Sequence, residues 1–509
     1  MKYIVGVDEG TTSCKTCVFD ENGKLLASAS REYPSYYPKP GYVEQDLEEI
    51  IRGVYDSCRE AIRKSGVKRE DIVGVSFSNQ GALLMLDKDG NSALKRAIGW
   101  QDMRYNEVLP EARKRLAGVM SEDEFFKLAG YSYGFYNIPQ IDWVKKHDPE
   151  GWANVACVCG HQTFLLKKFG APGFFIDESE GAVLGMMNVD TREWDDRLIA
   201  ANGIDRSLLP KIIHKPGDVV GHVTEEVAFE TGLPVGCNIG VGGHDVNCSK
   251  MGCGAKEGGT ETLIVGTAGV SLLVCDEPIR DPQKRITFRT NPGFDNYQQY
   301  ILIYTAASSF RWFRDEMCSF EVAASHLMNT DPYDIMTTIA KNSKPGANGV
   351  TAMTCLQGAH GRRKNGNARG TFFGISLGTT KADLAQAIME GITYEMYDII
   401  RMNEEYTTIN KVRLCGGVIK SPYWCQMFAD VFGKPIEVTE SPELGALGAG
   451  MFAGIAGGVF RDCAEAIDKC VRLAKIYTPD PEKHKIYEQA FQVWSEAYMT
   501  VNGTFYKQA

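Results

Sequence analysis

Two short hairpin patterns, each with a Gly-Thr turn, constrain the fold of this chain more than any other feature. The first joins the apolar runs at residues 4–7 and 14–19. The second joins residues 262–265 and 270–274, about 255 residues later in the chain. Each run has the length of a strand, and the turns are rich in glycine and hydroxyl residues. The repetition predicts two related halves.

The segment after the first hairpin predicts an α/β layer fold. A third strand is expected at residues 25–30, an amphipathic helix at residues 46–64 and another strand at residues 72–77. The helix is predicted from apolar residues that recur on one stripe: Leu47, Ile50, Ile51, Val54, Cys58, Ala61 and Ile62. Antiparallel strands followed by a helix and a further strand are typical of α/β layers.

The length of 509 residues is too great for one ordinary core and predicts two domains. The glycine-rich stretch at residues 252–259 is the natural boundary, so we expect domains at residues 1–256 and 257–509. In the second half, helical spacing surrounds residues 384–392, and the last fifty residues form a mostly polar helix. Further elements are expected there: strands at 412–414 and 436–438 and helices at 421–432 and 445–454.

Charge and composition narrow the class of partner. The formal net charge is -10, which argues against nucleic acid or an anionic membrane. No apolar run predicts a signal peptide or a membrane span. The 15 cysteines are scattered, so reduced thiols in the cytoplasm are expected. Cys14 and Cys17 form a C-x-x-C within a predicted strand, where they would point to opposite faces rather than act as a redox pair.

The first turn presents groups that suit a phosphate. Gly10, Thr11, Thr12 and Ser13 offer consecutive backbone N–H groups and three hydroxyls at a tight bend. Asp8, just before them, could hold Mg²⁺ directly or through water, because Mg²⁺ prefers oxygen ligands. The alternative is an ordinary surface hairpin turn.

Two further glycine turns favour the phosphate hypothesis. They lie at residues 266–267 and 416–417, and each follows a predicted strand. Three such turns in two related halves suit a nucleotide held in a cleft between domains.

Asp245 is a candidate general base. It follows Gly242, Gly243 and His244, and the glycines remove side-chain bulk around the carboxylate. Such a carboxylate could accept a proton from an attacking hydroxyl. The alternatives are that Asp245 caps a helix and that His244 is an ordinary histidine near a turn.

Residues 100–104 combine an aromatic ring with an amide, a carboxylate and a guanidinium. Polyhydroxylated ligands need hydrogen-bonding groups and an apolar face on which to stack. Trp100, Asp102 and Arg104 are therefore candidate sugar-binding residues. A buried tryptophan beside a surface Asp–Arg pair is the alternative.

Taken together, these motifs resemble the FGGY family of carbohydrate kinases. The resemblance covers about residues 3–457, almost the whole chain. Six pieces occur in the family's order: GVDEGTTSCKTCVFD, GWQDMR, GGHDVNCSKMGCG, VGTAGV, FRWFRD and a long stretch from RLCGG to GALGAG.

The resemblance implies an actin-like ATPase fold with two RNase H-like domains and a nucleotide cleft between them. It further implies that ATP is the phosphoryl donor, that Asp8 binds Mg²⁺ and that Asp245 is the catalytic base. The implied nucleotide contacts are Thr11, Thr12, Ser13, Thr267, Ala307, Arg311, Gly417 and Ser421. The implied sugar-side residues are Asn79, Gln80, Trp100, Asp102, Arg104 and His244.

The acceptor is narrowed by the sequence after Asn79-Gln80. Glycerol kinases of the family carry Arg-Glu there, whereas this chain has Gly81-Ala82, whose small side chains are expected to leave space for a longer acceptor. Xylulose kinases look closer at residues 100–104 but usually carry a Met-His that is absent here, and His244 resembles kinases of deoxy-sugars or polyols. We expect a ketose or polyol of four to six carbons as the small-molecule partner, and a homodimer stays open. The alternatives are a glycerol kinase and an actin-like ATPase with a conformational role.

Overall fold

The computed structural model describes residues 1–136, 138–359 and 361–506, which pack into two compact units. Unit 1 comprises Met1–Lys256, Asp276–Gln298 and Glu443–Val471; unit 2 comprises Glu257–Cys275, Gln299–Pro442 and the described residues from Arg472 onward. The expected boundary after residue 256 is present, but two later segments return to unit 1, so the units are not two contiguous halves. No helix among the described residues is long and apolar enough to span a membrane.

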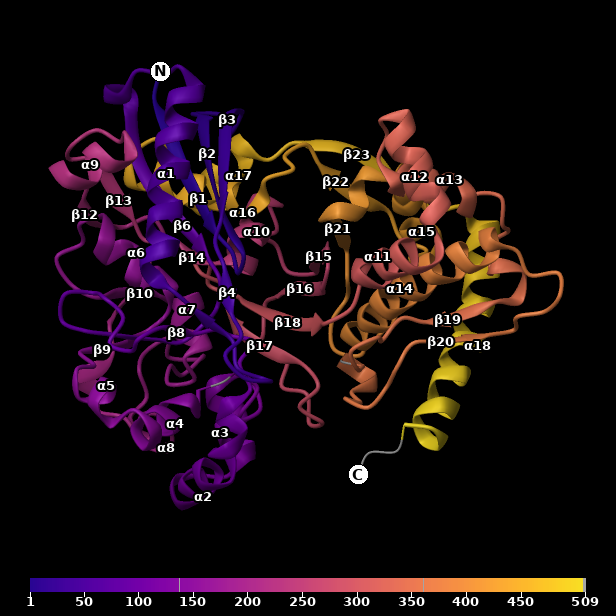
Figure 1. The fold of residues 1–509 in the computed structure, drawn as a ribbon, viewed down its shortest axis with the longest axis horizontal. Helices are drawn as coiled ribbons and strands as arrows, with labels where there is room; N and C mark the ends of the chain where they lie inside the picture. Colours follow the sequence, from indigo (N-terminus) through magenta and orange to yellow (C-terminus); the bar gives the residue numbers. More distant parts are fainter. Residues whose placement is uncertain (137, 360, 507–509) are drawn as a thin grey trace. The chain divides into compact units, whose positions relative to one another are not determined.

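Unit 1 is built on a mixed sheet in the order β12-β13-β6-β1-β2-β3 (Figure 1). The strands are β1 (Tyr3–Glu9), β2 (Ser13–Asp20), β3 (Leu25–Glu32), β6 (Ile72–Asn79), β12 (Val219–His222) and β13 (Asn238–Gly240). β1, β2 and β3 are antiparallel neighbours, and β6 lies parallel to β1. The predicted hairpin, third strand, helix (α1, Leu47–Ser65) and following strand are all confirmed.

Six neighbouring strands of the second seven-stranded sheet repeat this topology for unit 2, in the order β18-β16-β15-β21-β22-β23. The strands are β15 (Thr260–Val265), β16 (Gly269–Cys275), β18 (Tyr297–Ile303), β21 (Lys411–Cys415), β22 (Ile436–Thr439) and β23 (Leu473–Tyr477). β15 and β16 form the hairpin, β21 joins β15 in parallel, and the edge strand β23 is antiparallel, as β12 is in unit 1. The prediction of two related halves is confirmed.

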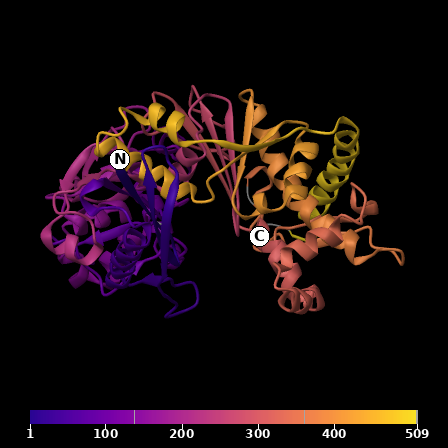
Figure 2. The ribbon, with the colours of Figure 1, turned by 90° about the horizontal axis from the view of Figure 1, so that it is seen from above.

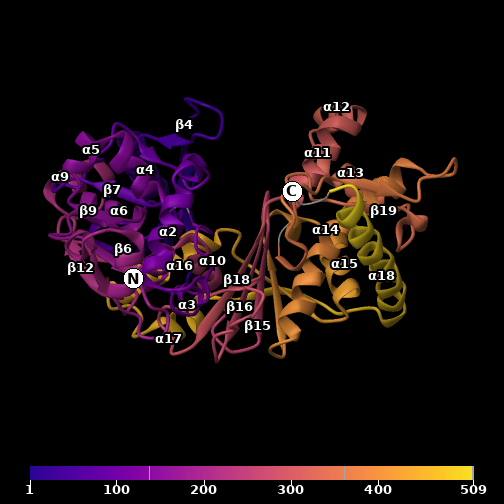
Figure 3. The same cartoon turned by 90° about the horizontal axis from the view of Figure 1, so that it is seen from below.

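The remaining helices are divided between the two units. Those of unit 1 are α2 (Leu109–Val119), α3 (Glu122–Ala129), α4 (Gln140–His147), α5 (Pro149–Ala153), α6 (His161–Phe169), α7 (Glu178–Val183), α8 (Asp196–Asn202), α9 (Glu225–Thr231), α10 (Asp245–Gly252), α16 (Leu444–Ala456) and α17 (Cys463–Cys470). Those of unit 2 are α11 (Ala307–Met317), α12 (Ser319–Met328), α13 (Pro332–Ala340), α14 (Lys381–Glu404), α15 (Pro422–Phe432) and α18 (Pro481–Thr504). Figure 3 shows α14, α15 and α18 side by side in unit 2.

Small residues explain why α16 belongs to unit 1. A Cβ built on Gly6 of β1 would lie 1.9 Å from Ala446 O, and one on Gly74 of β6 would lie 2.2 Å from Ala453 O. Both distances are far below van der Waals contact, so only glycine lets the helix backbone approach the sheet this closely. Figures 1 and 2 show α16 and α17, in yellow, against the indigo strands of unit 1.

The two cysteines of the C-x-x-C lie on opposite faces of this sheet, as predicted. Cys14 packs in the core between the sheet and α1, and Cys17 packs in the core between the sheet and α16. Both side chains are fully buried and free of disulfide. They are core residues.

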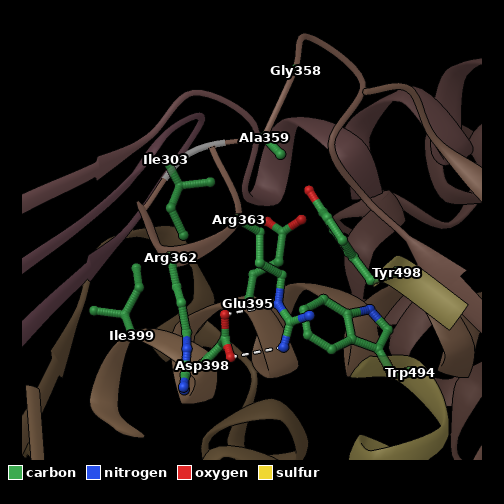
Figure 4. A pocket seen from close by; sticks show the side chains of 10 residues that line it. All are labelled: Ile303, Gly358, Ala359, Arg362, Arg363, Glu395, Asp398, Ile399, Trp494 and Tyr498. Carbon is green, nitrogen blue, oxygen red and sulfur yellow. Dashed lines mark hydrogen bonds and ion pairs between the residues drawn. The ribbon is translucent and has the colours of Figure 1, made fainter. Parts of the chain in front are cut away.

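Within unit 2, Arg363 links the C-terminal helix α18 to α14 (Figure 4). The Arg363 guanidinium donates to both oxygens of Asp398 on α14 at 2.9 and 3.0 Å, and to Ser495 Oγ on α18 at 2.9 Å. It lies 5.0 Å from the ring centroid of Trp494 and 5.2 Å from that of Tyr498. The adjoining cavity of about 20 Å³ has room for about one water. These contacts have a structural role, because they hold α18 against α14.

Candidate active site

The turn between β1 and β2 is held from behind by buried side chains. Tyr33 donates through its hydroxyl to Gly10 O and through its backbone N–H to Thr12 O at 3.1 Å. Gln45 Nε2 donates to Thr11 O at 2.7 Å. In a planar trans peptide the carbonyl and the next N–H point in opposite directions. The amides of Thr11 and Thr12 therefore point away from the core, as an anion site requires.

Asp8, at the end of β1, lies beside this turn. Ser78 on the parallel strand β6 donates to Asp8 Oδ1 at 2.6 Å. Burial raises the pKa of Asp8 to about 7 against that hydrogen bond, and the nearby carboxylates of Asp245, Glu9 and Glu443 raise it further. Repulsion by these carboxylates would fall if a cation were present.

The start of α16 also faces Asp8. A Cβ on Gly445 would lie 2.8 Å from the Asp8 carboxylate, so the helix begins directly against it. The positive end of the helix dipole favours a negative charge at that position. Glu443, just before α16, forms an ion pair with Lys15 of β2 at 2.8 Å. No sequence pattern indicates the Lys15–Glu443 pair or Ser78, because both depend on tertiary register.

Asp245 is the first residue of α10, and its side chain is 40% exposed. It is not the helix cap, which is His244. Its Oδ1 accepts from Val246 N at 2.6 Å and lies 3.4 Å from His244 Nδ1. His244 N in turn donates to Ser179 Oγ at 2.9 Å, and Ser179 Oγ donates to Asp177 Oδ2 at 2.5 Å. A chain of buried hydrogen bonds therefore fixes the backbone that presents Asp245 to solvent.

The space expected beside Gly81 and Ala82 is partly filled. A Cβ on Gly81 would lie 2.2 Å from His244 Nε2, so the imidazole occupies the room that a larger side chain would take. Ala82 is 1% exposed. The expectation that Gly81 leaves space for a longer acceptor is therefore wrong: the missing side chain is replaced by His244 from another part of the sequence.

Asn79 and Gln80 lie behind the site rather than on its surface. They are 0% and 1% exposed. Asn79 Nδ2 donates to Glu180 Oε1 at 2.5 Å, and Gln80 Nε2 donates to Glu9 Oε1 at 2.7 Å and to Gly10 O at 3.3 Å. Their amide donors are thus engaged with buried carboxylates and with the turn.

Residues 100–104 include one partly exposed candidate residue and two buried ones. Trp100 is 36% exposed, and its Nε1 donates to Thr11 Oγ1 at 2.9 Å. Asp102 and Arg104 are buried and joined by two side-chain hydrogen bonds of 2.9 Å. Val43 N donates to Asp102 Oδ2 at 2.6 Å, and Arg104 Nη2 also donates to Glu44 Oε1 at 2.9 Å. The alternative is therefore wrong on both counts: Trp100 is partly exposed, and Asp102 and Arg104 form a buried pair rather than a surface pair.

A buried acidic segment near the site was not among the residues predicted from the sequence. It comprises Asp177, Glu178 and Glu180, around the start of α7. Burial raises the pKa of Asp177 to about 6 and that of Glu180 well above its usual value. His161 is also fully buried and lies 3.3 Å from Glu9 Oε2. The run of acidic residues at 177–180 was the available signal, but nothing in the sequence indicates that it is buried.

Unit 2 contains a separate cavity of about 370 Å³. All five nucleotide-binding candidates of this unit line it: Thr267, Ala307, Arg311, Gly417 and Ser421. The cavity is also lined by three aromatic residues that were not among the candidates: Phe310, Tyr333 and Trp424. A concave site with apolar walls and a few polar groups at its edge is typical of small-ligand sites.

The backbone around this cavity is tightly constrained. The turn at Gly266 and Thr267 accepts from the start of α11, with Ala307 N to Gly266 O at 2.9 Å. Gly416 has φ +89°, and a Cβ there would lie 2.4 Å from Val265 O. Glycine is therefore required at the strand end that leads into the cavity.

Comparison with protein families places the chain. Residues 3–252 match the N-terminal domain, and residues 262–457 the C-terminal domain, of the FGGY family of carbohydrate kinases. The chain belongs to this family. It is therefore an ATP-dependent carbohydrate kinase, and its two-unit α/β architecture is the actin-like ATPase fold that the motifs implied.

Relatives match over nearly the whole length. A xylulose kinase from Bacillus subtilis is 28% identical over 506 residues, covering 98% of this chain and 97% of the relative. A gluconokinase from the same organism is 26% identical over 498 residues, covering 97% of this chain and 94% of the relative. The crystal structure of a ligand-bound xylulose kinase from Lactobacillus acidophilus has a TM-score of 0.88 and 25% identity, covering 99% of each chain. Family membership predicts the reaction but leaves the acceptor open.

Proposed function

We propose that this kinase transfers the γ-phosphoryl group of ATP to a hydroxyl of a neutral ketose or polyol, with Asp245 as the general base. The observation that carries the proposal is the position of Asp245. Its carboxylate is exposed at the start of α10, where the hydrogen bond from His244 N to Ser179 fixes the backbone. It also lies close enough to Asp8 to raise the pKa of the Asp8 carboxyl. Acceptor and phosphate chemistry would thus meet in unit 1.

The proposed mechanism assigns each step to a residue. Asp245 accepts the proton of the attacking hydroxyl as the oxygen bonds to phosphorus. The amides of Thr11 and Thr12, with the hydroxyls of Thr11, Thr12 and Ser13, stabilise charge on the transferred group. Fixed donors of this kind need little rearrangement during the reaction, because buried groups already hold the turn.

Asp8 fits a role at Mg²⁺. Its carboxylate has a raised pKa among other carboxylates, so a cation there would relieve repulsion. Mg²⁺ prefers oxygen ligands and usually keeps several waters, so one carboxylate with phosphate oxygens can hold it. Bound Mg²⁺ would supply neutralising charge to the phosphates, and Asp8 would hold it directly or through water.

The adenosine part of ATP is assigned to unit 2. Its cavity of about 370 Å³ is lined by Thr267, Ala307, Arg311, Gly417 and Ser421. In this assignment Thr267 contacts phosphate, the aromatic walls accommodate the base, and Ser421 lies on the adenosine side.

The carboxylates of unit 1 favour a neutral acceptor. The carboxylates of Glu9 and Asp245 lie close enough to raise the pKa of Asp8 and that of Glu180. Lys15 is already paired with Glu443. A carboxylate-bearing acceptor, such as the gluconate that one relative's name indicates, would add like charge to this cluster. A ketose, as named for the xylulose kinases, or a polyol would not.

Glycerol is predicted to be a poor acceptor. Gly81 and Ala82 offer neither a guanidinium nor a carboxylate to hold a small triol. Loose placement of the reacting hydroxyl relative to Asp245 costs rate steeply, by about a hundredfold for an error of about 1 Å. Catalytic efficiencies for glycerol, erythritol, xylitol, xylulose, ribulose and gluconate, measured at the same ATP and Mg²⁺ concentrations, test the assignment. Preference for glycerol or gluconate would refute the proposed acceptor class while leaving the kinase reaction intact.

Thr12→Val is predicted to raise the Michaelis constant for ATP, or lower turnover, by about three- to tenfold, the value of one lost hydrogen bond. Thr12 is exposed at the tip of the phosphate turn, so valine should preserve folding. Steady-state kinetics at saturating acceptor provide the measurement. Unchanged ATP kinetics would make the first turn merely structural.

A further inference from the structure

One hydrogen bond joins Trp100, a candidate sugar-binding residue, to the turn at residues 10–13, which is proposed to bind phosphate. Trp100 Nε1 donates to Thr11 Oγ1 at 2.9 Å. The side chain is still 36% exposed, so part of its ring surface is open to a ligand while its N–H is engaged. The same residue therefore touches both substrate sites proposed for unit 1.

This bond orients the Thr11 hydroxyl. A hydroxyl has one hydrogen to donate and two lone pairs that accept, whereas the indole N–H only donates. When Trp100 occupies a lone pair of Thr11 Oγ1, the Thr11 O–H is left to donate elsewhere. Gln45 holds the Thr11 carbonyl at 2.7 Å from the buried side, which restrains rotation of the turn. The hydroxyl and the outward amides then form one donor set for a phosphate oxygen.

Gln80 provides a second connection between the two sides. Its Nε2 donates to Gly10 O at 3.3 Å, at the base of the turn. The next residue, Gly81, lies against the ring of His244, which precedes the proposed base. The turn is thus supported by two side chains: the buried Gln80 from behind and the partly exposed Trp100.

We propose that Trp100 is a positioning residue for ATP as well as a wall for the acceptor, and that its indole N–H couples acceptor binding to phosphate binding at Thr11. This inference rests on the function proposed above. An acceptor stacked on the ring orders Trp100, and the ordered indole keeps the Thr11 O–H directed toward phosphate. Acceptor and ATP therefore strengthen each other's binding, because coupling between two sites is reciprocal.

The test is a double-mutant cycle on nucleotide affinity. Trp100→Phe keeps an aromatic ring but removes the indole N–H, and Thr11→Val removes its acceptor with little change in volume. Calorimetry measures the Kd of the non-hydrolysable analogue AMP-PNP, with Mg²⁺, in the presence and absence of saturating xylulose or the best acceptor of the panel. Wild-type protein should bind the analogue more tightly when the acceptor is present. In each single variant this gain in affinity should be about two- to tenfold smaller. The double variant should be no worse than Thr11→Val alone.

Trp194→Phe is the matched control. Trp194 Nε1 also donates one hydrogen bond of 2.9 Å, to Pro210 O, and this variant should retain the wild-type gain. Independent, multiplicative effects of Trp100→Phe and Thr11→Val would overturn the inference, as would a full gain in Trp100→Phe. If wild-type protein phosphorylates the acceptor but shows no gain in affinity, only this inference fails. If no acceptor supports ADP formation, the proposed function fails, and this inference with it.

Discussion

Asp245→Asn should lower turnover by about a hundred- to ten-thousand-fold, the usual contribution of a general base. The amide preserves the shape of the side chain but cannot take the proton of the attacking hydroxyl. Folding should be unaffected, because Asp245 is partly exposed and its Oδ1 accepts a hydrogen bond from Val246 N that an amide oxygen can also accept. Steady-state kinetics with the best acceptor, together with the Kd for AMP-PNP, separate loss of chemistry from loss of binding.

Asp196→Asn is a suitable control for this substitution. Asp196 is likewise the first residue of a helix, α8, and it is exposed, with an ion pair to Arg206. Its replacement should leave turnover unchanged. Near wild-type turnover of Asp245→Asn would show that another group accepts the proton.

Gly6→Ala should destabilise unit 1 substantially. Its Cβ would lie 1.9 Å from Ala446 O and 2.6 Å from Gly450 N, both backbone atoms of α16. Overpacking usually costs about 1–3 kcal/mol and sometimes more, because neighbouring backbone must shift. A shift of α16 would also move Gly445 away from Asp8, so activity should fall with stability. Thermal unfolding followed by circular dichroism gives the change in midpoint.

Gly118→Ala is the matched substitution. Gly118 lies within α2, and a Cβ there would have no heavy atom within 4 Å. Since alanine favours a helix interior over glycine by about 1 kcal/mol, this variant should be as stable as wild type or more so. Equal midpoints for Gly6→Ala and wild type would mean that α16 does not pack against β1 as closely as described.

The sheets could be predicted because their signals are local. Alternating or continuous apolar runs around the turns at Gly10 and Gly266 identified both hairpins, and the stripe of α1 identified its helix. The return of residues 443–471 to unit 1 could not be predicted. It depends on Gly6 and Gly74 meeting the backbone of α16, and glycine spacing in one strand does not indicate which helix will approach.

The turns of the proposed site follow from local sequence, whereas the side chains that support them do not. Asp8, Thr12 and Asp245 were candidates from their glycine and hydroxyl context; they lie at the end of β1, in the turn before β2 and at the start of α10. Asn79 and Gln80 were expected to touch sugar, yet both are buried against glutamates. Polar residues that face a ligand and polar residues that support it from behind have the same composition, and only burial distinguishes them.

The cavity of unit 2 illustrates the same limit. The family resemblance supplied Thr267, Gly417 and Ser421, which all line it. The aromatic walls at Phe310 and Trp424 were not named, because aromatic residues in apolar helices are usually core. Their place beside the cavity follows from how α11 and α15 pack, which is a tertiary property.

The most direct test of the proposed reaction is ADP formation by wild-type protein and Asp245→Asn, with ATP and Mg²⁺, in the presence and absence of each acceptor. We predict that wild-type protein forms ADP rapidly only when a neutral ketose or polyol is present, in amounts equal to the phosphorylated product, and that Asp245→Asn does so at least about a hundredfold more slowly. Rapid ADP formation without any acceptor, unchanged by the panel, would contradict the account and favour an ATPase with a conformational role.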